Sequence, residues 1–551
     1  MSAPQTPTTR AVESETTGSP ARLTGWAAVA GFVSAVVTLA VAEVLALLIG
    51  GGNPLLAVGS LIVDLAPPGL KDLVISLFDT ANKLVLFLCL GVLVSVLAVG
   101  AGILELRRPP LGRVAIGLVA AVAVVAAVTR ADAGVLAALP TVGGAAGGIL
   151  MLRVLLRRLR AWRDARPRTT GPATAWTPPG VSLTSRIAPT SRGTEYERRG
   201  FLRLVVAVGV TSAVVGVGAR VLSAARAAAS DVREMLTLPP PGEATAALTE
   251  AQDVALDGLS TFVTPNDEFY RIDTALQVPA VDAASWTLRI VGMVEEEVEI
   301  GFDELLALPL VERYITLACV SQEVGGGLIG NARWLGFPIR ELLARARPTA
   351  DADMVLSRSV DGFTASTPLE VLQDPATDSL LAVGMNGEPL PLDHGFPVRM
   401  VVPGLYGYVS ATKWVTELRV TTFADDLAYW STRGWTERGP VKLSSRIDTP
   451  PDRRRIEPGP TKIAGVAWAQ HTGVSAVEVR IDDGRWQQAS LADEVSVDAW
   501  LQWWFDWDAA SGSHTIEVRA TDADGLVQTA DLAPPAPDGS TGHHTITVRV
   551  D

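Results

Sequence analysis

Long apolar runs fill the first part of the chain and predict helices that cross a membrane. A bilayer-spanning helix needs about 20 mostly apolar residues. Runs near that length cover residues 26–49, 84–104, 114–128, 135–156 and 201–222. Residues 55–78 are also apolar, but two prolines and three charged residues interrupt them, so we interpret this stretch as a membrane-surface or re-entrant segment. The pattern therefore predicts five spans.

Beyond residue 246 the long runs end, and short segments with a different periodicity follow. SWTLRIVGMV and EVEIGF are typical of strands, whereas FDELLAL and IRELLARA are typical of short amphipathic helices. From Lys462 onwards all segments are of the strand type, and turn sequences such as DDG, SGS and DADG separate them. We therefore expect a mixed α+β domain followed by an immunoglobulin-like β-sandwich.

These changes of pattern divide the chain into seven segments. We expect a cytoplasmic tail (1–23), a four-helix membrane region (24–160), a basic cytoplasmic linker (161–199), a fifth transmembrane helix (200–223), a linker (224–246), the mixed domain (247–455) and the sandwich (456–551). The Pro- and Gly-rich sequence LPPPGEAT marks the second linker, and TPPDRRRIEPGP marks the last boundary. The predicted fold class is thus multidomain, with an α-helical transmembrane anchor before the two exported domains.

The net charge changes sign after the membrane region. Residues 1–229 contain 22 Lys and Arg against 11 Asp and Glu, a net charge of +11. Since the whole chain has a net charge of −13, the remainder carries −24. Such acidity argues against a nucleic-acid binder, which needs a basic surface. The presence of only two cysteines excludes a disulfide-rich scaffold.

Arginines between the apolar runs predict the orientation in the membrane. Arg107, Arg108 and Arg113 lie between the second and third runs, and seven arginines lie within residues 153–168. Loops rich in Lys and Arg stay on the cytoplasmic side. Five spans that start inside place everything after Leu222 outside the cytoplasm. We expect a multi-pass protein of a bacterial cell membrane, with its acidic part on the extracytoplasmic side.

The sequence ERRGFLRLVVAVG precedes the fifth run. Its arginine pair, Arg198 and Arg199, is followed by Phe201, Leu202 and a modest apolar stretch. This arrangement is typical of a twin-arginine export signal. The alternative is that these arginines only anchor the fifth helix on the cytoplasmic side. Twin-arginine signals export domains that have already folded, usually around a cofactor, so the first interpretation predicts a cofactor in the acidic part.

Cys319 is the one cysteine of the acidic part, and it lies in RYITLACVSQEVGGGLIG. An apolar strand ends there and a Gly-rich loop follows. A lone cysteine in such a place is often an inert core thiol. A nucleophile would need a basic partner, and His394 is the only histidine in this domain. A metal site built on one thiolate needs its other ligands from elsewhere, for example from a cofactor.

Haem is not expected in this protein. The sequence contains no C-x-x-C-H attachment motif, and all five histidines lie beyond the membrane region. Any electrons would therefore pass through a separate cytochrome or quinone-linked partner.

Several segments follow one another in the acidic part: TPNDEFYRID (264–273), the TLAC segment that ends at Cys319 with NARWLGFPI after it, SVDGFTASTPLE (359–370), GEPLPLDHGFPVRMVVPGLYGY (387–408) and ATKW (411–414). Together, and in this order, they resemble the sulfite oxidase family of molybdenum-cofactor (molybdopterin) oxidoreductases. The C-terminal sandwich resembles the dimerisation domain of that family, so a homodimer is expected. The resemblance covers roughly residues 250–551.

This resemblance implies one molybdenum–molybdopterin cofactor per chain, with Cys319 as the protein thiolate on the metal. The residues implied to bind the cofactor are Asn266, Phe269, Tyr270, Ser359, Asp361, His394, Arg399 and Lys413. The pterin ends in a phosphate, which needs buried cations such as Arg399 and Lys413. Taken singly, Arg399 could be a structural ion-pair partner, Lys413 a solvated strand-edge residue and His394 a satisfied core histidine.

The sequence departs from the family at the positions that bind sulfite. Glu323 and Val324 stand four and five residues after Cys319, where the sulfite enzymes have arginines. Arg271 follows Tyr270 at once, and Ile272 takes the place of the family's arginine. Trp435 takes the place of the family's active-site tyrosine. Cys319, Glu323, Arg271 and Trp435 are therefore the candidate catalytic residues, although Glu323 could instead be a solvated loop acid.

A dianion such as sulfite requires converging cations in its pocket, and a glutamate there would repel it. We therefore expect a neutral substrate, such as a sulfoxide or an N-oxide. The predicted function is oxygen-atom transfer, or related two-electron redox chemistry, outside the cytoplasm. The alternative is a non-catalytic envelope protein that binds a partner through a cofactor-free domain of the same fold. A transporter is poorly supported, because Glu43 is the main charge within the apolar runs.

Overall fold

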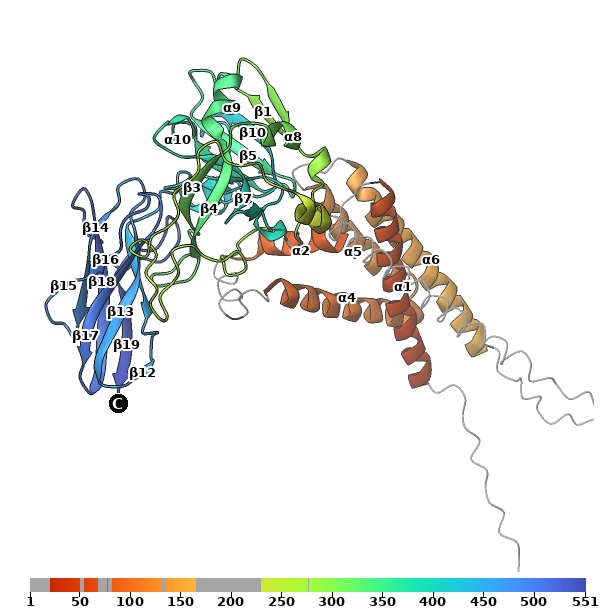
Figure 1. Ribbon diagram of the computed structural model, residues 1–551. Coiled ribbons are helices and arrows are strands. Elements are labelled where there is room, and N and C mark those ends of the chain that lie inside the picture. Colours follow the sequence, from red (N-terminus) through yellow and green to blue (C-terminus); the bar gives the residue numbers. More distant parts are fainter. Residues whose placement is uncertain are drawn as a thin grey trace, which may run out of the picture. The chain divides into compact units, whose positions relative to one another are not determined.

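The computed structural model describes residues 20–49, 54–67, 77, 82–129, 135–164, 229–275 and 277–551. The chain divides into two compact units, residues 1–223 and residues 224–551. The first unit is helical and the second is rich in sheet (Figure 1). Each unit is described by itself below.

Among its described residues, the helical unit contains four helices that are long and apolar enough to cross a membrane. They are α1 (Pro20–Ile49), α4 (Asn82–Arg107), α5 (Leu111–Val128) and α6 (Leu139–Asp164), which the short 3-10 helix η2 (Val135–Ala138) precedes. Four of the five expected spans are therefore confirmed as long apolar helices. The fifth run, 201–222, and the arginine pair Arg198 and Arg199 lie outside the described residues. The interrupted stretch 55–78 begins as α2 (Pro54–Leu65), which is shorter than a span.

Small residues let two of these helices approach closely. A Cβ on Gly31 of α1 would lie 2.1 Å from the Ala98 carbonyl oxygen of α4, and one on Gly102 of α4 would lie 2.1 Å from the Ala27 oxygen of α1. Such contacts are typical of helix pairs in membranes, where van der Waals packing drives association. Near the end of α4, the buried Glu105 forms an ion pair with Arg113 at 2.8 Å, so the charge is compensated.

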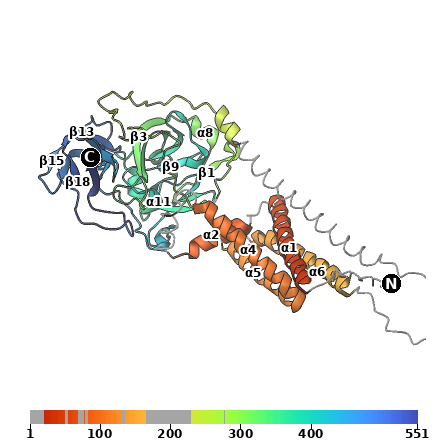
Figure 2. The ribbon, with the colours of Figure 1, turned by 90° about the horizontal axis from the view of Figure 1, so that it is seen from below.

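The second unit begins with a mixed domain built on two sheets. The first sheet has the strand order β2-β1-β10-β5-β6, and the second has the order β3-β4-β7-β8 with β9 also paired to β7. The strands are β1 (Thr287–Gly292), β2 (Val298–Gly301), β3 (Val311–Ala318), β4 (Ile329–Pro338), β5 (Met354–Ser359), β6 (Thr364–Pro368), β7 (Leu380–Met385), β8 (Glu388–Pro389), β9 (Arg399–Val401) and β10 (Val415–Thr421). Figure 2 shows β1, β3 and β9 of this domain together, away from the C-terminal strands.

Short helices connect these strands. They are α8 (Phe302–Leu306), α9 (Ile339–Ala346), α10 (Leu369–Gln373), α11 (Gly407–Ser410) and the 3-10 helices η3 (Ala283–Ser285), η4 (Leu392–His394) and η5 (Ser431–Arg433). The predicted strands in SWTLRIVGMV and EVEIGF are confirmed as β1 and β2, and the predicted helices in FDELLAL and IRELLARA as α8 and α9. All of β7 and nearly all of β3 are buried, and β7 accordingly has a continuous apolar sequence, LLAVGM.

The C-terminal domain consists of two sheets around a common core. One has the order β11-β13-β17-β16 and the other β12-β19-β18-β14-β15. The strands are β11 (Ser444–Thr449), β12 (Arg455–Ile456), β13 (Gly459–Trp468), β14 (Val474–Ile481), β15 (Gln487–Gln488), β16 (Ser490–Leu491), β17 (Leu501–Ala509), β18 (Gly512–Asp522) and β19 (His544–Val550). A predicted two-sheet domain is present, whereas its immunoglobulin-like character remains a prediction.

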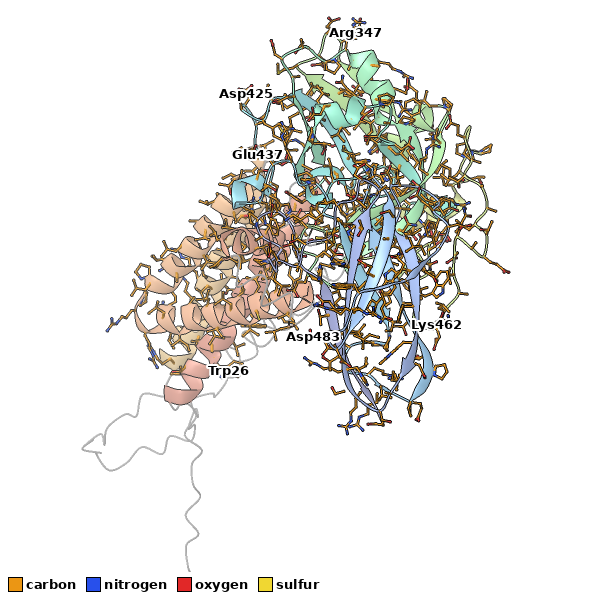
Figure 3. The ribbon with its side chains drawn as sticks, turned by 90° about the vertical axis from the view of Figure 1, so that its left-hand side faces the viewer. Trp26, Arg347, Asp425, Glu437, Lys462 and Asp483 are labelled. Atoms are coloured by element: carbon orange, nitrogen blue, oxygen red, sulfur yellow. The ribbon has the colours of Figure 1, made fainter. Side chains whose placement is uncertain are left out.

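Alternation along the strands decides which side chains enter this core. In β18 the side chains of Ile516, Val518 and Ala520 are buried, and the residues between them are more exposed. Lys462 of β13 points outward and pairs with Asp506 at 2.5 Å (Figure 3). Sheet pairing begins at Ser444 in β11, ahead of the expected domain boundary at residue 456. Trp468 and Trp500 pack into the core of the mixed domain, so the two domains share buried surface.

Candidate active site

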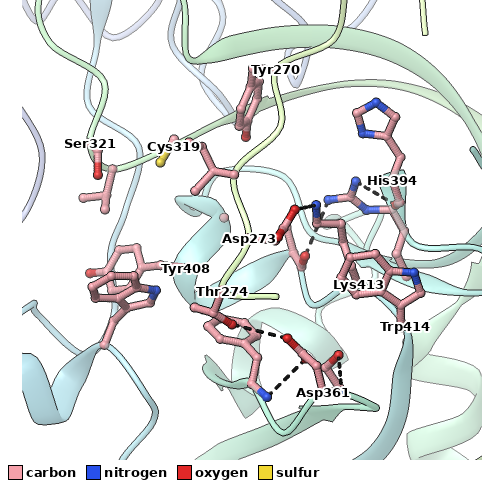
Figure 4. Close-up of a pocket in the computed structure, with 18 of the residues that line it drawn as sticks. Tyr270, Asp273, Thr274, Cys319, Ser321, Asp361, His394, Tyr408, Lys413 and Trp414 are labelled. Carbon is pink, nitrogen blue, oxygen red and sulfur yellow. Dashed lines mark hydrogen bonds and ion pairs between the residues drawn. The ribbon is translucent and has the colours of Figure 1, made fainter. Parts of the chain in front are cut away.

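A pocket of about 890 Å³, including its open mouth, collects most of the residues that the sequence singles out (Figure 4). Nine of them line it: Phe269, Tyr270, Cys319, Ser359, Asp361, His394, Arg399, Lys413 and Trp435. They come from six stretches of the chain, and the ends of the strands bring them together.

Cys319 directly follows β3, and its thiol faces the pocket while the residue is buried. Its backbone N–H donates to the Leu328 carbonyl at 2.9 Å, so residues 319–328 form a loop that closes at its base. Burial raises the pKa of the thiol, and hydrogen bonds from Ser321 act in the opposite direction. Without a metal ion such a thiol stays protonated at neutral pH, whereas a metal ion would deprotonate it.

Two buried cations line the same pocket. The Arg399 guanidinium donates to the His394 carbonyl at 3.2 Å and lies 5.1 Å from the centre of the Trp334 ring. Burial lowers the pKa of Arg399 to about 10, so the side chain stays charged at neutral pH. Lys413 forms an ion pair with Asp273 at 2.9 Å, and both side chains are less than a tenth exposed. The pocket therefore contains positive charge that water screens poorly.

His394 is held in one orientation beside these cations. Its Nε2–H donates to the Asn266 carbonyl oxygen at 3.1 Å, because a carbonyl can only accept. Burial and the charges of Arg399 and Lys413 lower the pKa of His394 to about 4. The ring is therefore neutral at neutral pH, with Nδ1 left as a hydrogen-bond acceptor.

Three expected site residues do not line the pocket. Asn266 contacts the pocket only indirectly, because its backbone carbonyl accepts a hydrogen bond from His394, which lines the pocket. Its side chain accepts a hydrogen bond from Asn386 at 2.8 Å. Arg271 pairs with Asp393 at 2.5 Å on a partly exposed surface. Glu323 is exposed in the loop after Cys319, which agrees with the alternative of a solvated loop acid. The geometry thus does not bring Arg271 or Glu323 to the thiol.

The pocket also contains residues that the sequence did not single out. Those with polar or aromatic side chains are Asp273, Thr274, Ser321, Phe363, Tyr408, Trp414 and Trp430. Asp361 accepts from the Thr274 hydroxyl at 3.4 Å, which ties two of the lining segments together. Asp273, Tyr408 and Trp414 lie inside the segments that carry the resemblance, so that signal could have found them. Ser321 could not have been identified from the sequence, because it belongs to no recognised motif and its distance from Cys319 is not typical of any binding site.

The C-terminal domain holds the loop that carries Cys319. Arg446 donates to the Gly326 carbonyl at 3.0 Å, and the Ser540 hydroxyl donates to the Gln322 carbonyl at 2.7 Å. Gly325 has a φ of +78°, and a Cβ on it would lie 2.2 Å from the His544 ring. Residues from two sheets of the C-terminal domain therefore fix residues 319–328 from outside.

If Cys319 is a metal ligand, as the resemblance implies, Arg446→Ala should lower turnover by about 10- to 100-fold, the effect typical of groups that orient a metal ligand. The expected cause is a loosened loop and a misplaced Cys319. Turnover and metal content of the purified full-length protein would be measured. Arg549→Ala is the control, because Arg549 lies on the same domain in an exposed pair with Asp551. Unchanged turnover in both Arg446→Ala and Ser540→Ala would contradict a positioning role of this contact.

The chain matches a known family over the centre of this pocket. Residues 275–430 match the model of the oxidoreductase molybdopterin binding domain. The mitochondrial sulfite oxidase of Mus musculus is 31% identical over 288 residues, which cover 44% of this chain and 52% of that protein. The uncharacterized oxidoreductase YuiH of Bacillus subtilis is 32% identical over 158 residues, which cover 29% of this chain and 76% of that protein.

Among solved structures, the sulfane dehydrogenase SoxCD from Paracoccus pantotrophus is similar with a TM-score of 0.47 and 24% identity. The match covers 58% of this chain and 89% of that chain. The chain spans about half the length of the curated mammalian sulfite oxidases that it matches. The family model, the two curated relatives and the ordered segments around Cys319 agree, and the chain belongs to the sulfite oxidase family of molybdopterin-binding oxidoreductases.

Proposed function

We propose that this protein is a membrane-anchored molybdenum oxidoreductase that transfers an oxygen atom to or from a small uncharged substrate outside the cytoplasm. The observation that carries the proposal is the pocket itself, in which a buried thiol and two buried cations lie together in a molybdopterin-binding domain. The membrane part of the proposal rests on the four long apolar helices.

The donor set of the pocket fits a molybdenum–molybdopterin cofactor. A thiolate is the soft ligand that a metal with dithiolene sulfurs prefers, and Cys319 offers one at the pocket wall. Arg399 and Lys413 provide buried N–H donors with positive charge, which suit the phosphate of the pterin. Bound there, the cofactor would supply two-electron oxygen-atom transfer, while the protein supplies orientation and electrostatics.

The side chains around the cofactor site have separate tasks in this proposal. Cys319 would hold the metal, and the loop contacts of Arg446 and Ser540 would keep its sulfur in place. His394 stays neutral and can accept a hydrogen bond at Nδ1 without adding charge. Asp273 balances the charge of Lys413 inside the pocket. The rings of Phe269 and His394, which contact each other edge to face, exclude water from their side of the pocket.

The substrate that we propose is a sulfoxide or an N-oxide. In the reducing direction, a sulfoxide takes up two electrons and two protons and gives a sulfide and one water. The electrons would come from a separate cytochrome or quinone-linked protein. Sulfite is disfavoured, because Glu323 and Val324 replace cations next to Cys319 and neither brings a positive charge to the pocket.

The full-length protein purified from molybdate-fed cells should contain about one molybdenum atom per chain. With artificial electron donors and acceptors it should reduce sulfoxides or N-oxides faster than it oxidises sulfite. Metal analysis and a substrate screen on the same preparation would check both points. A folded protein without molybdenum would favour the non-catalytic binding protein instead, and faster turnover of sulfite would overturn the substrate proposal.

We also propose that Arg198 and Arg199 belong to a twin-arginine export signal. The double variant Arg198→Lys, Arg199→Lys keeps both positive charges, so a simple anchor of the fifth helix should tolerate it. Export through a twin-arginine signal should fail, and residues 224–551 should stay in the cytoplasm. Protease added to spheroplasts would test this, since only an exported domain is cut. Unchanged cleavage in the double variant would contradict the export signal.

A further inference from the structure

His471 lies where the C-terminal domain meets a segment that forms part of the pocket wall. It follows β13, and its backbone has a φ of +67°, in the left-handed region that residues other than glycine rarely adopt. The segment opposite it is Pro403–Tyr408, of which Gly407 and Tyr408 line the pocket. We call residues 403–408 the wall segment.

Both sides of the His471 ring have a polar partner. Nδ1 lies 3.0 Å from a carboxylate oxygen of Asp498, and the same oxygen accepts from the His471 backbone N–H at 3.1 Å. The opposite edge of the ring contacts the wall segment, because a Cβ on Gly404 would lie 2.0 Å from Nε2. The ring also forms a hydrogen bond with the backbone of Pro403. Since proline has no N–H, the Pro403 carbonyl accepts this bond and His471 donates it.

Asp498 is itself fixed to the strand that leads to Cys319. Its side chain is buried, and its backbone carbonyl accepts from the Thr316 N–H of β3 at 2.9 Å and from the Gln470 side chain at 2.9 Å. The Gln470 side chain also donates to the Thr316 carbonyl at 2.8 Å. His471 therefore connects a base that is bound to β3 with the wall segment.

This connection requires a proton on the His471 ring. A neutral imidazole has one N–H group, whereas the imidazolium has two. Only the imidazolium can therefore donate to Asp498 and to Pro403 at the same time. When the proton is lost and Nδ1–H stays with Asp498, the lone pair of Nε2 faces the Pro403 carbonyl oxygen, and the contact becomes repulsive.

The acids around the ring favour the protonated form. The hydrogen bond to Asp498 raises the pKa of His471, burial opposes this effect, and the charges of Asp498 and of the more distant Asp374 add to it. A third acid, Glu494, approaches the same turn, since a Cβ on Gly473 would lie 2.8 Å from its carboxylate. The imidazolium is thus surrounded by negative charge.

The wall segment and β3 do not offset this preference. The wall segment contains no Asp, Glu, Lys or Arg. Its two tyrosines stay neutral near pH 7, because burial raises the pKa of Tyr406 to about 12 and also raises the pKa of Tyr408. The charged residues of β3, Glu312 and Arg313, form ion pairs with other groups.

The direction of the pH dependence follows from the raised pKa. The protonated contact stabilises the folded protein fully below the ordinary histidine pKa of about 6.5. This stabilisation is lost as the pH rises through the higher pKa of His471 in the folded protein. Because the side chain is 41% exposed, the ring can exchange its proton with the surrounding water.

We propose that His471 is a proton-dependent latch, which holds the wall segment against the C-terminal domain in acidic surroundings and releases it in alkaline ones. Release loosens the placement of Gly407 and Tyr408 in the pocket wall. The latch itself does not depend on the chemistry of the pocket, whereas its effect on turnover rests on the proposed function. In the proposed extracytoplasmic location, the ring senses the pH outside the cell membrane.

Hydrogen–deuterium exchange, read by mass spectrometry, measures this release without any need for turnover. The full-length protein in detergent would be compared at about pH 5.5 and about pH 8.5, on either side of the ordinary histidine pKa. Protection factors, which correct for the pH dependence of intrinsic exchange, should fall about three- to tenfold in the wall segment at the higher pH. A larger fall is not expected, because water partly screens a charge on an exposed ring. Peptides from β13 should keep their protection and show that the domain stays folded.

Substitutions assign the effect to the latch. His471→Asn removes the titrating ring and suits the backbone, because asparagine tolerates the left-handed region. Its wall segment should show the same low protection at both pH values. Asp498→Asn keeps the shape of the acceptor but removes its charge, so the loss of protection should move to lower pH. His514→Asn is the control, since His514 also pairs with an acid, Asp482 at 2.6 Å, but within the C-terminal domain.

The outcomes separate the latch from the proposed function. Equal protection of the wall segment at both pH values in the unsubstituted protein would overturn the latch, as would an unchanged pH dependence in His471→Asn. A protein that transfers oxygen but lacks the exchange pattern would refute the latch alone. A protein that shows the pattern and its loss in His471→Asn, but turns over no oxygen donor or acceptor, would support the latch and refute the proposed function.

Discussion

Cys319→Ser should abolish oxygen-atom transfer while the protein still folds and inserts into the membrane. The substitution replaces a soft sulfur donor with a hard oxygen that binds a sulfur-rich metal centre poorly. Removal of the protein ligand itself should cost more than the 10- to 100-fold loss typical of groups that only orient ligands. Because the thiol is buried and makes few polar contacts, serine should change the packing of the pocket little.

Turnover with a sulfoxide and the molybdenum spectrum of the same preparation would be compared with those of the unsubstituted protein. Cys89→Ser is the matched control, since Cys89 is an exposed cysteine on α4 in the helical unit. Membrane fractionation would show that all three proteins insert equally. Normal turnover in Cys319→Ser would refute the role of this thiol as metal ligand.

The long apolar helices and the strands of the mixed domain could be predicted because burial imposes a period on the sequence. In α1 and α4 the apolar run has the length of a span, and in β1 the buried positions alternate. The exact start of the C-terminal sheets could not be predicted. The sequence of Ser444–Thr449 (β11) is largely polar and typical of a connecting loop. Its pairing with β13 is what assigns it to the sheet.

Most of the pocket could be predicted through ordered segments rather than through spacing. Cys319 lies in one segment and His394 and Arg399 lie together in a later one, and only the fold brings the two segments to one cavity. A residue that is close in sequence to a pocket residue does not line the pocket where its loop turns outward. Arg271 is next to Tyr270 in sequence, yet its side chain points to Asp393 outside the pocket wall. Glu323 likewise follows Cys319 by four residues and lies exposed.

The sequence does not predict which side-chain donors and acceptors find a hydrogen-bond partner in the folded protein. The buried indole N–H groups of Trp286 and Trp334 donate to the carbonyls of Val415 and Ile315, which lie 129 and 19 residues away in the sequence. The contacts of Arg446 and Ser540 on the Cys319 loop cross more than 100 residues of sequence. Such long-range hydrogen bonds leave no local pattern, so they appear only when the chain is folded.

Asp273→Ala should destabilise the second unit strongly and reduce its cofactor content. The change removes the carboxylate that pairs with Lys413 at 2.9 Å in a site where both side chains are less than a tenth exposed. A buried charge that loses its partner typically costs about 3–5 kcal/mol. The midpoint of urea unfolding, followed by tryptophan fluorescence, should fall accordingly, and metal analysis should show less molybdenum per chain.

The exposed pair Arg271–Asp393 provides the control for this effect. Asp393→Ala breaks an ion pair whose side chains are 34% and 41% exposed, so it should cost at most about 1 kcal/mol. The double variant Asp273→Leu, Lys413→Met removes both buried charges and should recover much of the stability. It should not recover the cofactor, because one of the two cations proposed to bind the pterin phosphate is gone. Equal cofactor content in the double variant and the unsubstituted protein would show that Lys413 serves the fold alone.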